Sequence, residues 1–177
     1  MHQNNIHTAN SFMVEDFVVY GSAGVCRLTG IVSKCFDGKN NNDYLALEPI
    51  SSASSTYYIP IDTASSRLRK LLSKSEVNGL IDSMKTDNTE WCNDNKERKE
   101  FFSSTLRSHD LGKILIMLKI LHLQKEEKAK DGKRLVTSDE LAMSEGENLV
   151  YSEFSLVLGI KYDDVEEFIC NKIGVTE

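Results

Sequence analysis

The hydrophobic pattern of this chain changes in character once, near residue 73. Before that point, short runs of β-branched and aromatic residues are separated by turns rich in glycine, asparagine and serine, which is typical of a series of short strands. After it, apolar residues recur every three or four positions, as they do along amphipathic helices. We therefore expect an α+β protein in which a β domain precedes a separate all-α domain, and a length of 177 residues allows two small domains.

The region before residue 73 has room for five strands and little else. Residues 37–43 predict a hairpin loop, and the serine-rich run 51–55 predicts a second turn. Five short strands over about sixty residues favour an SH3-like or Tudor-like β-barrel. Pro60 has no N–H to donate to a neighbouring strand, so we expect it in an edge strand or near the end of a strand. The expected strands cover residues 16–20, 25–35, 43–49, 56–61 and 66–70.

The region after residue 73 predicts a bundle of about five helices. Their starts are marked by residues that can cap free backbone N–H groups, and Gly159 marks an end. Gly146 lies inside one predicted helix at a cost of about 1 kcal/mol relative to alanine, which favours close packing at that position. The expected starts lie at Ser73 with Glu76, near residue 93, at Asp110, at Thr137 with Glu140, and at Asp163 with Glu166.

Two runs in the β region carry a more specific signal. Phe17–Ile31 reads FVVYGSAGVCRLTGI, and Tyr57–Asp62 reads YYIPID. Together they resemble the RNA-polymerase-interacting domain of the CarD family, which is shared with the transcription-repair coupling factor. Beyond the β region the resemblance is weaker and rests on a lone tryptophan, Trp91, ahead of a charged helix, and on the helix start Ser108–Asp110. It implies a β-barrel followed by five helices.

The resemblance also implies a bacterial, cytoplasmic transcription regulator with a defined domain order. Residues 1–11 are then a flexible lead-in, residues 12–72 the polymerase-interacting barrel, and residues 73–177 a helical domain that contacts DNA. Such a regulator binds the β subunit of RNA polymerase and promoter DNA at the upstream edge of the transcription bubble, where it changes the stability of the open complex. We expect it to act as a monomer.

The polymerase contact implied by the family is the addition of a strand to the barrel edge. The candidate strand is residues 56–60, in which Tyr58 is expected to face outward and Tyr57 to share a face with Ile59. Familiar relatives carry arginine at the positions of Lys34 and Tyr58, so this chain keeps one charge and replaces the other by an aromatic ring. The alternative is that Lys34 is solvated and the tyrosines only cover the barrel. The candidate polymerase-binding residues are Lys34, Thr56, Tyr57, Tyr58, Ile59 and Pro60.

Trp91 is the DNA contact that the resemblance implies. In the family, a tryptophan at this position wedges into the minor groove, and the polar neighbours of Trp91 favour its exposure. The alternative is that Trp91 packs against its own helices. Nearby cations would bind phosphates without reading sequence, although Arg98 and Lys99 could pair with acidic residues of the same helix instead. The candidate DNA-binding residues are Trp91, Lys96, Arg98, Lys99, Lys113 and Lys119.

The distribution of charge limits how strongly this chain can bind DNA. Residues 85–134 contain 12 basic and 9 acidic residues, whereas residues 135–177 contain 2 basic and 10 acidic residues. Asn93 and Asp94 stand where familiar relatives carry basic residues. We therefore expect weak, sequence-independent DNA binding that depends on a tether to the polymerase. The alternative is a polymerase-binding adaptor whose acidic helical domain recruits another protein rather than DNA.

Other classes of function leave no signal in the sequence. The basic cluster within residues 125–134 is interleaved with acidic residues and fits a solvated helix end. No phosphate-binding glycine loop, nucleophile elbow or zinc-protease motif is present, so we expect neither an enzyme nor a cofactor nor a small-molecule substrate. Four scattered cysteines lack metal-ligand spacing, which indicates reduced thiols rather than a zinc site. No apolar run is long enough for a membrane span, so no membrane contact is expected.

Overall fold

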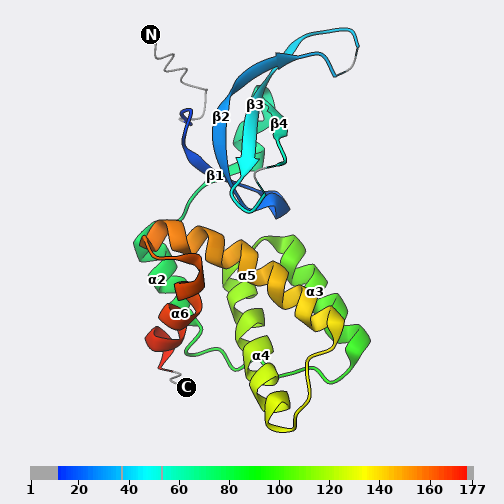
Figure 1. The fold of residues 1–177 in the computed structure, drawn as a ribbon, viewed down its shortest axis with the longest axis vertical. Coiled ribbons are helices and arrows are strands. Elements are labelled where there is room, and N and C mark those ends of the chain that lie inside the picture. The colour runs from blue at the N-terminus through cyan, green and yellow to red at the C-terminus, as the bar shows by residue number, and fades with distance from the viewer. Residues whose placement is uncertain (1–11, 37, 53, 175–177) are drawn as a thin grey trace. The chain divides into compact units, whose positions relative to one another are not determined.

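A computed structural model describes residues 12–36, 38–52 and 54–174. The chain divides between Leu71 and Leu72 into two compact units, which are treated separately below (Figure 1). We call residues 12–71 the sheet unit and residues 72–174 the helical unit. The first contains all the strands of the described residues and the second contains only helices and turns, so the expected α+β class is confirmed.

The sheet unit is built on five antiparallel strands in the order β4-β3-β2-β1-β5. A short helix, α1 (Ala64–Arg67), precedes the last strand, which therefore starts two residues later than expected. The strands are β1 (Phe17–Tyr20), β2 (Val25–Lys34), β3 (Asn42–Pro49), β4 (Tyr57–Pro60) and β5 (Leu68–Lys70).

The expected SH3-like or Tudor-like barrel is not confirmed: in the described residues the five strands form an open sheet, in which β4 and β5 stand at opposite edges and do not pair. These edge strands have only four and three residues, which leaves few ladder bonds with which to join the edges. The long strand β2 instead bends the sheet: it pairs with β1 through its first residues and with β3 along its length, and its register shifts between Leu28 and Gly30.

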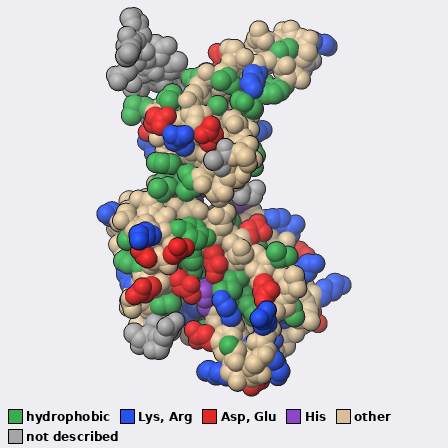
Figure 2. Space-filling model, viewed as in Figure 1, with side chains coloured by type: hydrophobic (Ala, Val, Ile, Leu, Met, Phe, Trp, Pro, Cys, Tyr) green, Lys and Arg blue, Asp and Glu red, His purple; other side chains and the backbone are tan. Residues whose placement is uncertain are grey.

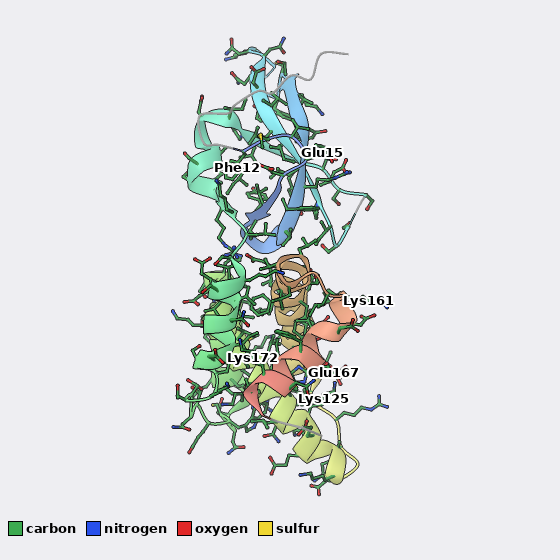
Figure 3. The ribbon with its side chains drawn as sticks, turned by 90° about the vertical axis from the view of Figure 1, so that its left-hand side faces the viewer. Phe12, Glu15, Lys125, Lys161, Glu167 and Lys172 are labelled. Carbon is green, nitrogen blue, oxygen red and sulfur yellow. The ribbon has the colours of Figure 1, made fainter. Side chains whose placement is uncertain are left out.

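One face of this sheet carries the core of the sheet unit. Phe12, labelled in Figure 3, is 5% exposed and packs in the same cluster as the inward residues of the strands. Ala64 of α1 belongs to the same cluster, so the short helix covers part of this core. The strand residues of this core are Val18, Cys26, Leu28, Leu45, Leu47, Ile59 and Leu68.

The helical unit contains five helices within its described residues, as expected. The two longest, α4 and α5, cross in Figure 1 and pack closely at Gly146, where an added Cβ would lie 2.9 Å from Met117 Cε. The expectation of close packing at Gly146 is therefore confirmed. The helices are α2 (Lys74–Ser83), α3 (Asn95–Ser108), α4 (Leu111–Lys130), α5 (Thr137–Leu158) and α6 (Val165–Ile173).

Most of the helix boundaries follow the predicted caps. Ser73 and Glu76 form the expected capping box, and Asp110 accepts hydrogen bonds from the first amides of α4. Gly159 ends α5 with a φ of 74°, a left-handed conformation that glycine adopts without strain. Helix α3 begins at residue 95 because Asp94 provides its cap.

Two predicted starts differ from the structure. Thr137 lies inside α5, and the N-cap residue is Val136, which has no side-chain acceptor, so no capping box forms with Glu140. The predicted start at Asp163 with Glu166 also differs. A 3-10 turn over Tyr162–Asp164 leads into α6, and Asp164, the N-cap residue of α6, makes no side-chain cap bond. At the other end of α6, Lys172 reaches α2, with its Nζ 3.7 Å from an Asp82 carboxylate oxygen (Figure 3). In the part of the chain described here, no helix combines the length and the apolar character that a bilayer span requires.

Candidate functional site

The strand β4 forms one edge of the sheet. It pairs antiparallel with β3, with Tyr58 opposite Ala46 and Ile59 opposite Leu45, and no other strand of the described residues pairs with it. Ile59 is 1% exposed and fills the core, whereas Tyr57 shares its face but remains 40% exposed, with its ring centre 5.5 Å from that of Tyr20. The free side of β4 can therefore accept an extended segment of another chain.

The ends of the candidate strand are also defined. Thr56 precedes β4 and is exposed. Pro60 is the last residue of β4, half-buried opposite Tyr44, and its carbonyl accepts a hydrogen bond from Thr63 Oγ1 at 3.2 Å. The expectation that Pro60 lies in an edge strand and near a strand end is confirmed.

The outer face of the sheet carries a cluster of three aromatic rings and one lysine, which we call the aromatic patch: Phe36, Tyr44, Tyr58 and Lys34. The Lys34 Nζ lies 3.8 Å from the centre of the Tyr58 ring, a cation–π distance. The Phe36 ring lies 5.0 Å from that of Tyr44 and 5.7 Å from that of Tyr58, yet Phe36 is 60% exposed. Tyr58 is half-buried beneath its neighbours.

Two members of the aromatic patch, Phe36 and Tyr44, were not predicted from the sequence. Phe36 follows Lys34 by two positions, a spacing that places two side chains on the same face of a strand. The sequence therefore contains a signal that could have placed Phe36 beside Lys34. Tyr44 could not be placed without the register, which sets it opposite Val32 and Pro60. The patch lies beside the open edge of β4, so a segment that pairs with β4 would also meet these side chains.

Residues 12–72 match the family of CarD-like/TRCF RID domains. The sheet unit is a CarD-like RNA-polymerase-interacting domain. The open β4 edge and the aromatic patch therefore belong to a class of domain that interacts with RNA polymerase in transcription. The family match ends where the helical unit begins. Among curated proteins, none matches this chain.

Trp91 lies in the connection between α2 and α3, residues 85–94, which we call the Trp91 segment. Its side chain is half-buried and packs against the core of the helical unit, with its ring centre 6.3 Å from that of Phe102. The Arg98 guanidinium carbon lies 4.3 Å from the centre of the same ring. Trp91 thus has one part in contact with its own helices and another part open to solvent.

Arg98 is not placed to bind phosphate, which corrects its predicted role. The residue is 3% exposed, and its guanidinium pairs with Asp139 of α5 at 2.9 Å. The same group donates to the carbonyl of Cys92 at 2.8 Å and to Asn95 Oδ1 at 2.6 Å. A buried guanidinium needs such partners because desolvation of an unpaired charge is very costly.

Lys119, another predicted phosphate contact, is engaged in hydrogen bonds within the helical unit. Its half-buried Nζ donates to the carbonyls of Met84 at 2.7 Å and Asp87 at 2.9 Å. These acceptors lie at the end of α2 and in the Trp91 segment. The pKa of the Asp87 carboxyl is lowered, first by hydrogen bonds from Thr89 and to a smaller extent by the charge of Lys119.

The remaining predicted cations are on the surface. Lys96 and Lys99 are exposed on α3, a few residues after Trp91. Lys113 is exposed near the start of α4, with its Nζ 3.7 Å from an Asp110 carboxylate oxygen. On the face shown in Figure 2, acidic and basic side chains are interspersed over the helical unit. The structure thus reduces the candidate DNA contacts to Lys96, Lys99, Lys113 and part of Trp91.

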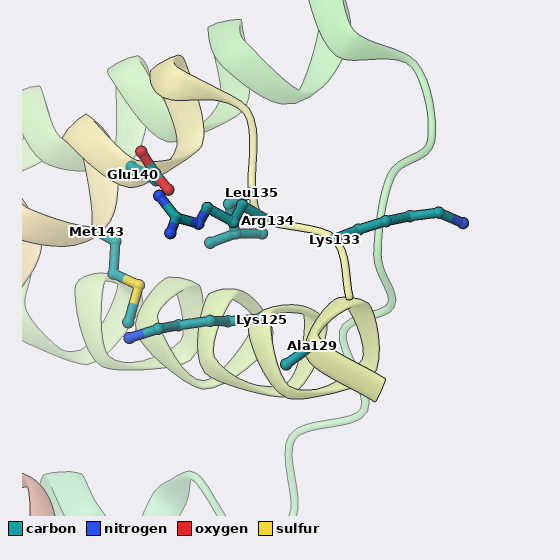
Figure 4. A pocket seen from close by; sticks show the side chains of 7 residues that line it. All are labelled: Lys125, Ala129, Lys133, Arg134, Leu135, Glu140 and Met143. Atoms are coloured by element: carbon teal, nitrogen blue, oxygen red, sulfur yellow. The ribbon is translucent and has the colours of Figure 1, made fainter. Parts of the chain in front are cut away.

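The basic cluster near the end of α4 borders a pocket of about 430 Å³ (Figure 4). Arg134 and the Glu140 carboxylate point toward each other across it, whereas Lys133 points away and pairs with Asp131 at 3.1 Å. The pocket lining therefore combines three basic side chains with one carboxylate. The lining residues are Lys125, Ala129, Lys133, Arg134, Leu135, Glu140 and Met143.

Proposed function

We propose that this chain is a transcription factor that binds the β subunit of RNA polymerase by strand addition to β4. The observation that carries the proposal is the unpaired edge of β4 beside the aromatic patch, within a CarD-like domain. Main-chain groups along β4 would supply affinity for an extended segment, and side chains next to the strand would supply specificity.

The aromatic patch indicates which side chains on the polymerase would be preferred. Lys34 presents a positive charge that favours an acidic partner residue, and its position above Tyr58 holds that charge at the surface. Phe36, at 60% exposure, offers the largest apolar surface of the patch to a partner. The contact therefore combines one charge with aromatic rings in edge-to-face and tilted arrangements, in contrast to the two arginines of familiar relatives.

Capture of purified bacterial RNA polymerase by the full chain tests this proposal. Tyr58→Asp places a charge in the patch, and Phe36→Asp does the same at a residue exposed enough to leave the fold intact. Both variants are expected to weaken capture by about tenfold or more, the loss expected when a hot-spot residue is removed. The matched control is Phe101→Asp, which changes a 43% exposed phenylalanine of the helical unit.

The subunit is tested by repeating the capture with the isolated β subunit. Binding to β that is lost in Phe36→Asp supports the proposed partner. Capture of whole polymerase together with failure to bind β would assign the contact to another subunit. Wild-type chain that captures no polymerase at all would overturn the proposal.

We also propose that the helical unit contacts promoter DNA at the upstream edge of the bubble and thereby changes open-complex stability. The support is the partly exposed Trp91 with the exposed Lys96 and Lys99 only a few residues further along the chain. An inserted apolar ring unstacks a base step, and DNA that is already melting lowers this cost. Few exposed cations lie close to Trp91 in the sequence, so the DNA contact depends on the effective concentration that the polymerase tether provides.

Open-complex lifetime on a promoter template tests the DNA contact. Trp91→Ala is expected to move the lifetime toward the value without the protein, while capture of polymerase stays unchanged. Lys96→Gln with Lys99→Gln should give a smaller loss that shrinks as salt rises, since phosphate contacts are screened. The acidic residues of 135–177 favour a second candidate, an adaptor that recruits a protein, and under it these variants leave the lifetime unchanged.

A further inference from the structure

Two cations from other parts of the helical unit hold the Trp91 segment at both of its ends. Lys119, on α4, bonds the carbonyls of Met84 and Asp87 where the segment begins. Arg98, on α3, bonds the carbonyl of Cys92 at 2.8 Å and that of Asn93 at 3.5 Å where the segment ends. A connection of ten residues without secondary structure over most of its length is thereby tied to two helices.

Arg98 differs from Lys119 because it also contacts the tryptophan itself. Its guanidinium covers the Trp91 ring at 4.3 Å and is anchored from behind by two contacts with Asp139, at 3.1 Å from Nε and 2.9 Å from Nη2. Asp139 is 1% exposed and belongs to α5. The Arg98 guanidinium therefore contacts the Trp91 ring, the backbone that follows Trp91 and, through Asp139, helix α5.

We propose that Arg98 is a positioning residue that presets Trp91 for its contact with promoter DNA. The inference rests on the DNA contact proposed above. A ring that is already oriented loses less conformational freedom when its partner binds, and this makes the contact stronger. The guanidinium is suited to the task because its fork can bond the carbonyls and the carboxylate while its face stacks on indole. A lysine keeps the charge but cannot make these contacts together.

The experiment compares the full chain with its Arg98→Lys variant, and uses Arg107→Lys as the matched control. Arg107 lies on the same helix but is exposed and pairs only with Glu100 among the residues described. Trp91 is the single tryptophan of the chain, so fluorescence excited at the red edge, where the six tyrosines do not absorb, reports on it alone. We expect Arg98→Lys to increase acrylamide quenching of Trp91 about twofold and to shorten its anisotropy decay, since a released ring samples more solvent. Arg107→Lys should match the wild type.

A second readout separates positioning from simple structural support. Open-complex lifetime in Arg98→Lys should shift toward the Trp91→Ala value, while polymerase capture, which uses the sheet unit, stays at the wild-type level. If Arg98→Lys does not fold, Asp139→Asn removes the anchor charge and leaves the side-chain size nearly unchanged, and the same two readouts apply to it.

The outcomes are distinct. The inference is overturned if Trp91→Ala alters the lifetime but the folded Arg98→Lys variant leaves either the quenching or the lifetime at the wild-type value, and in that case the DNA contact stands. If Trp91→Ala leaves the lifetime unchanged, the DNA contact itself fails and the positioning role fails with it. Parallel changes in quenching and lifetime support both.

Discussion

Lys34 holds its ammonium group 3.8 Å from the centre of the Tyr58 ring, across the outer face of the sheet. The two residues lie on β2 and β4, and β3 runs between them. The contact therefore ties the edge strand to the inner part of the sheet without a backbone hydrogen bond. It also fixes the position of the charge that faces a partner.

This contact should be measurable as a coupling in a double-mutant cycle. Lys34→Met, Tyr58→Leu and the double variant are expected to show a coupling of about 0.5–1 kcal/mol in the local unfolding free energy, the usual strength of an exposed cation–π pair. Native-state hydrogen exchange of the β3 amides measures it. As a control, a second cycle pairs Tyr58→Leu with Lys70→Met, at an exposed lysine of β5, and it should give no coupling. An equal coupling in this control cycle would contradict the assignment.

Two helical glycines should respond to alanine in opposite directions. Gly79→Ala, in open space on α2, is expected to raise the free energy of unfolding by about 0.5–1 kcal/mol through helix propensity. Gly146→Ala should lower it by about 1 kcal/mol, because the new methyl group would lie 2.9 Å from Met117 Cε and 3.1 Å from Leu118 Cδ2. Urea unfolding followed by circular dichroism measures both. Stabilisation by Gly146→Ala would show that α4 and α5 pack less tightly than described.

Burial raises the pKa of the Cys26 thiol from 9.0 to about 11. Its proton is thus held more tightly in the folded chain, and the associated stability is complete below pH 9 and lost as the pH rises through about 11. The loss attributable to this group is about 2–3 kcal/mol. Wild type and Cys26→Ala should therefore converge in stability between pH 8 and pH 11 in urea unfolding. A constant difference between them would place Cys26 in contact with solvent.

Asp110 should contribute to stability as the N-cap of α4. Its carboxylate accepts hydrogen bonds from the amides of Gly112 at 3.0 Å and Lys113 at 3.2 Å, and Asp110→Ala is expected to cost about 1 kcal/mol. Asp131→Ala, at the opposite end of the same helix, is the control. It should be neutral or slightly stabilising, because a negative charge is unfavourable at a helix C-terminus. Thermal unfolding of the three proteins gives the comparison.

The aromatic patch shows how much of the candidate site can be predicted from the sequence. Alternation along a strand correctly placed Tyr58 on the face opposite to Tyr57 and Ile59, because side-chain direction in a strand depends only on position. The neighbours of Tyr58 were not predictable in this way. Lys34 and Tyr44 reach it only through the pairing of three strands, and register depends on the whole sheet.

What the sequence alone determined are the features that depend on residues a few positions apart: the change from strands to helices near residue 73, the caps at Ser73 and Asp110, and the end of α5 at Gly159. Tertiary structure decided which cations are exposed and could contact DNA. Arg98 pairs with Asp139, 41 positions further along the chain, and Lys119 bonds Met84, 35 positions before it. A charged side chain looks the same in sequence whether it faces solvent or a buried carboxylate, because its environment is made by segments that meet only when the chain folds.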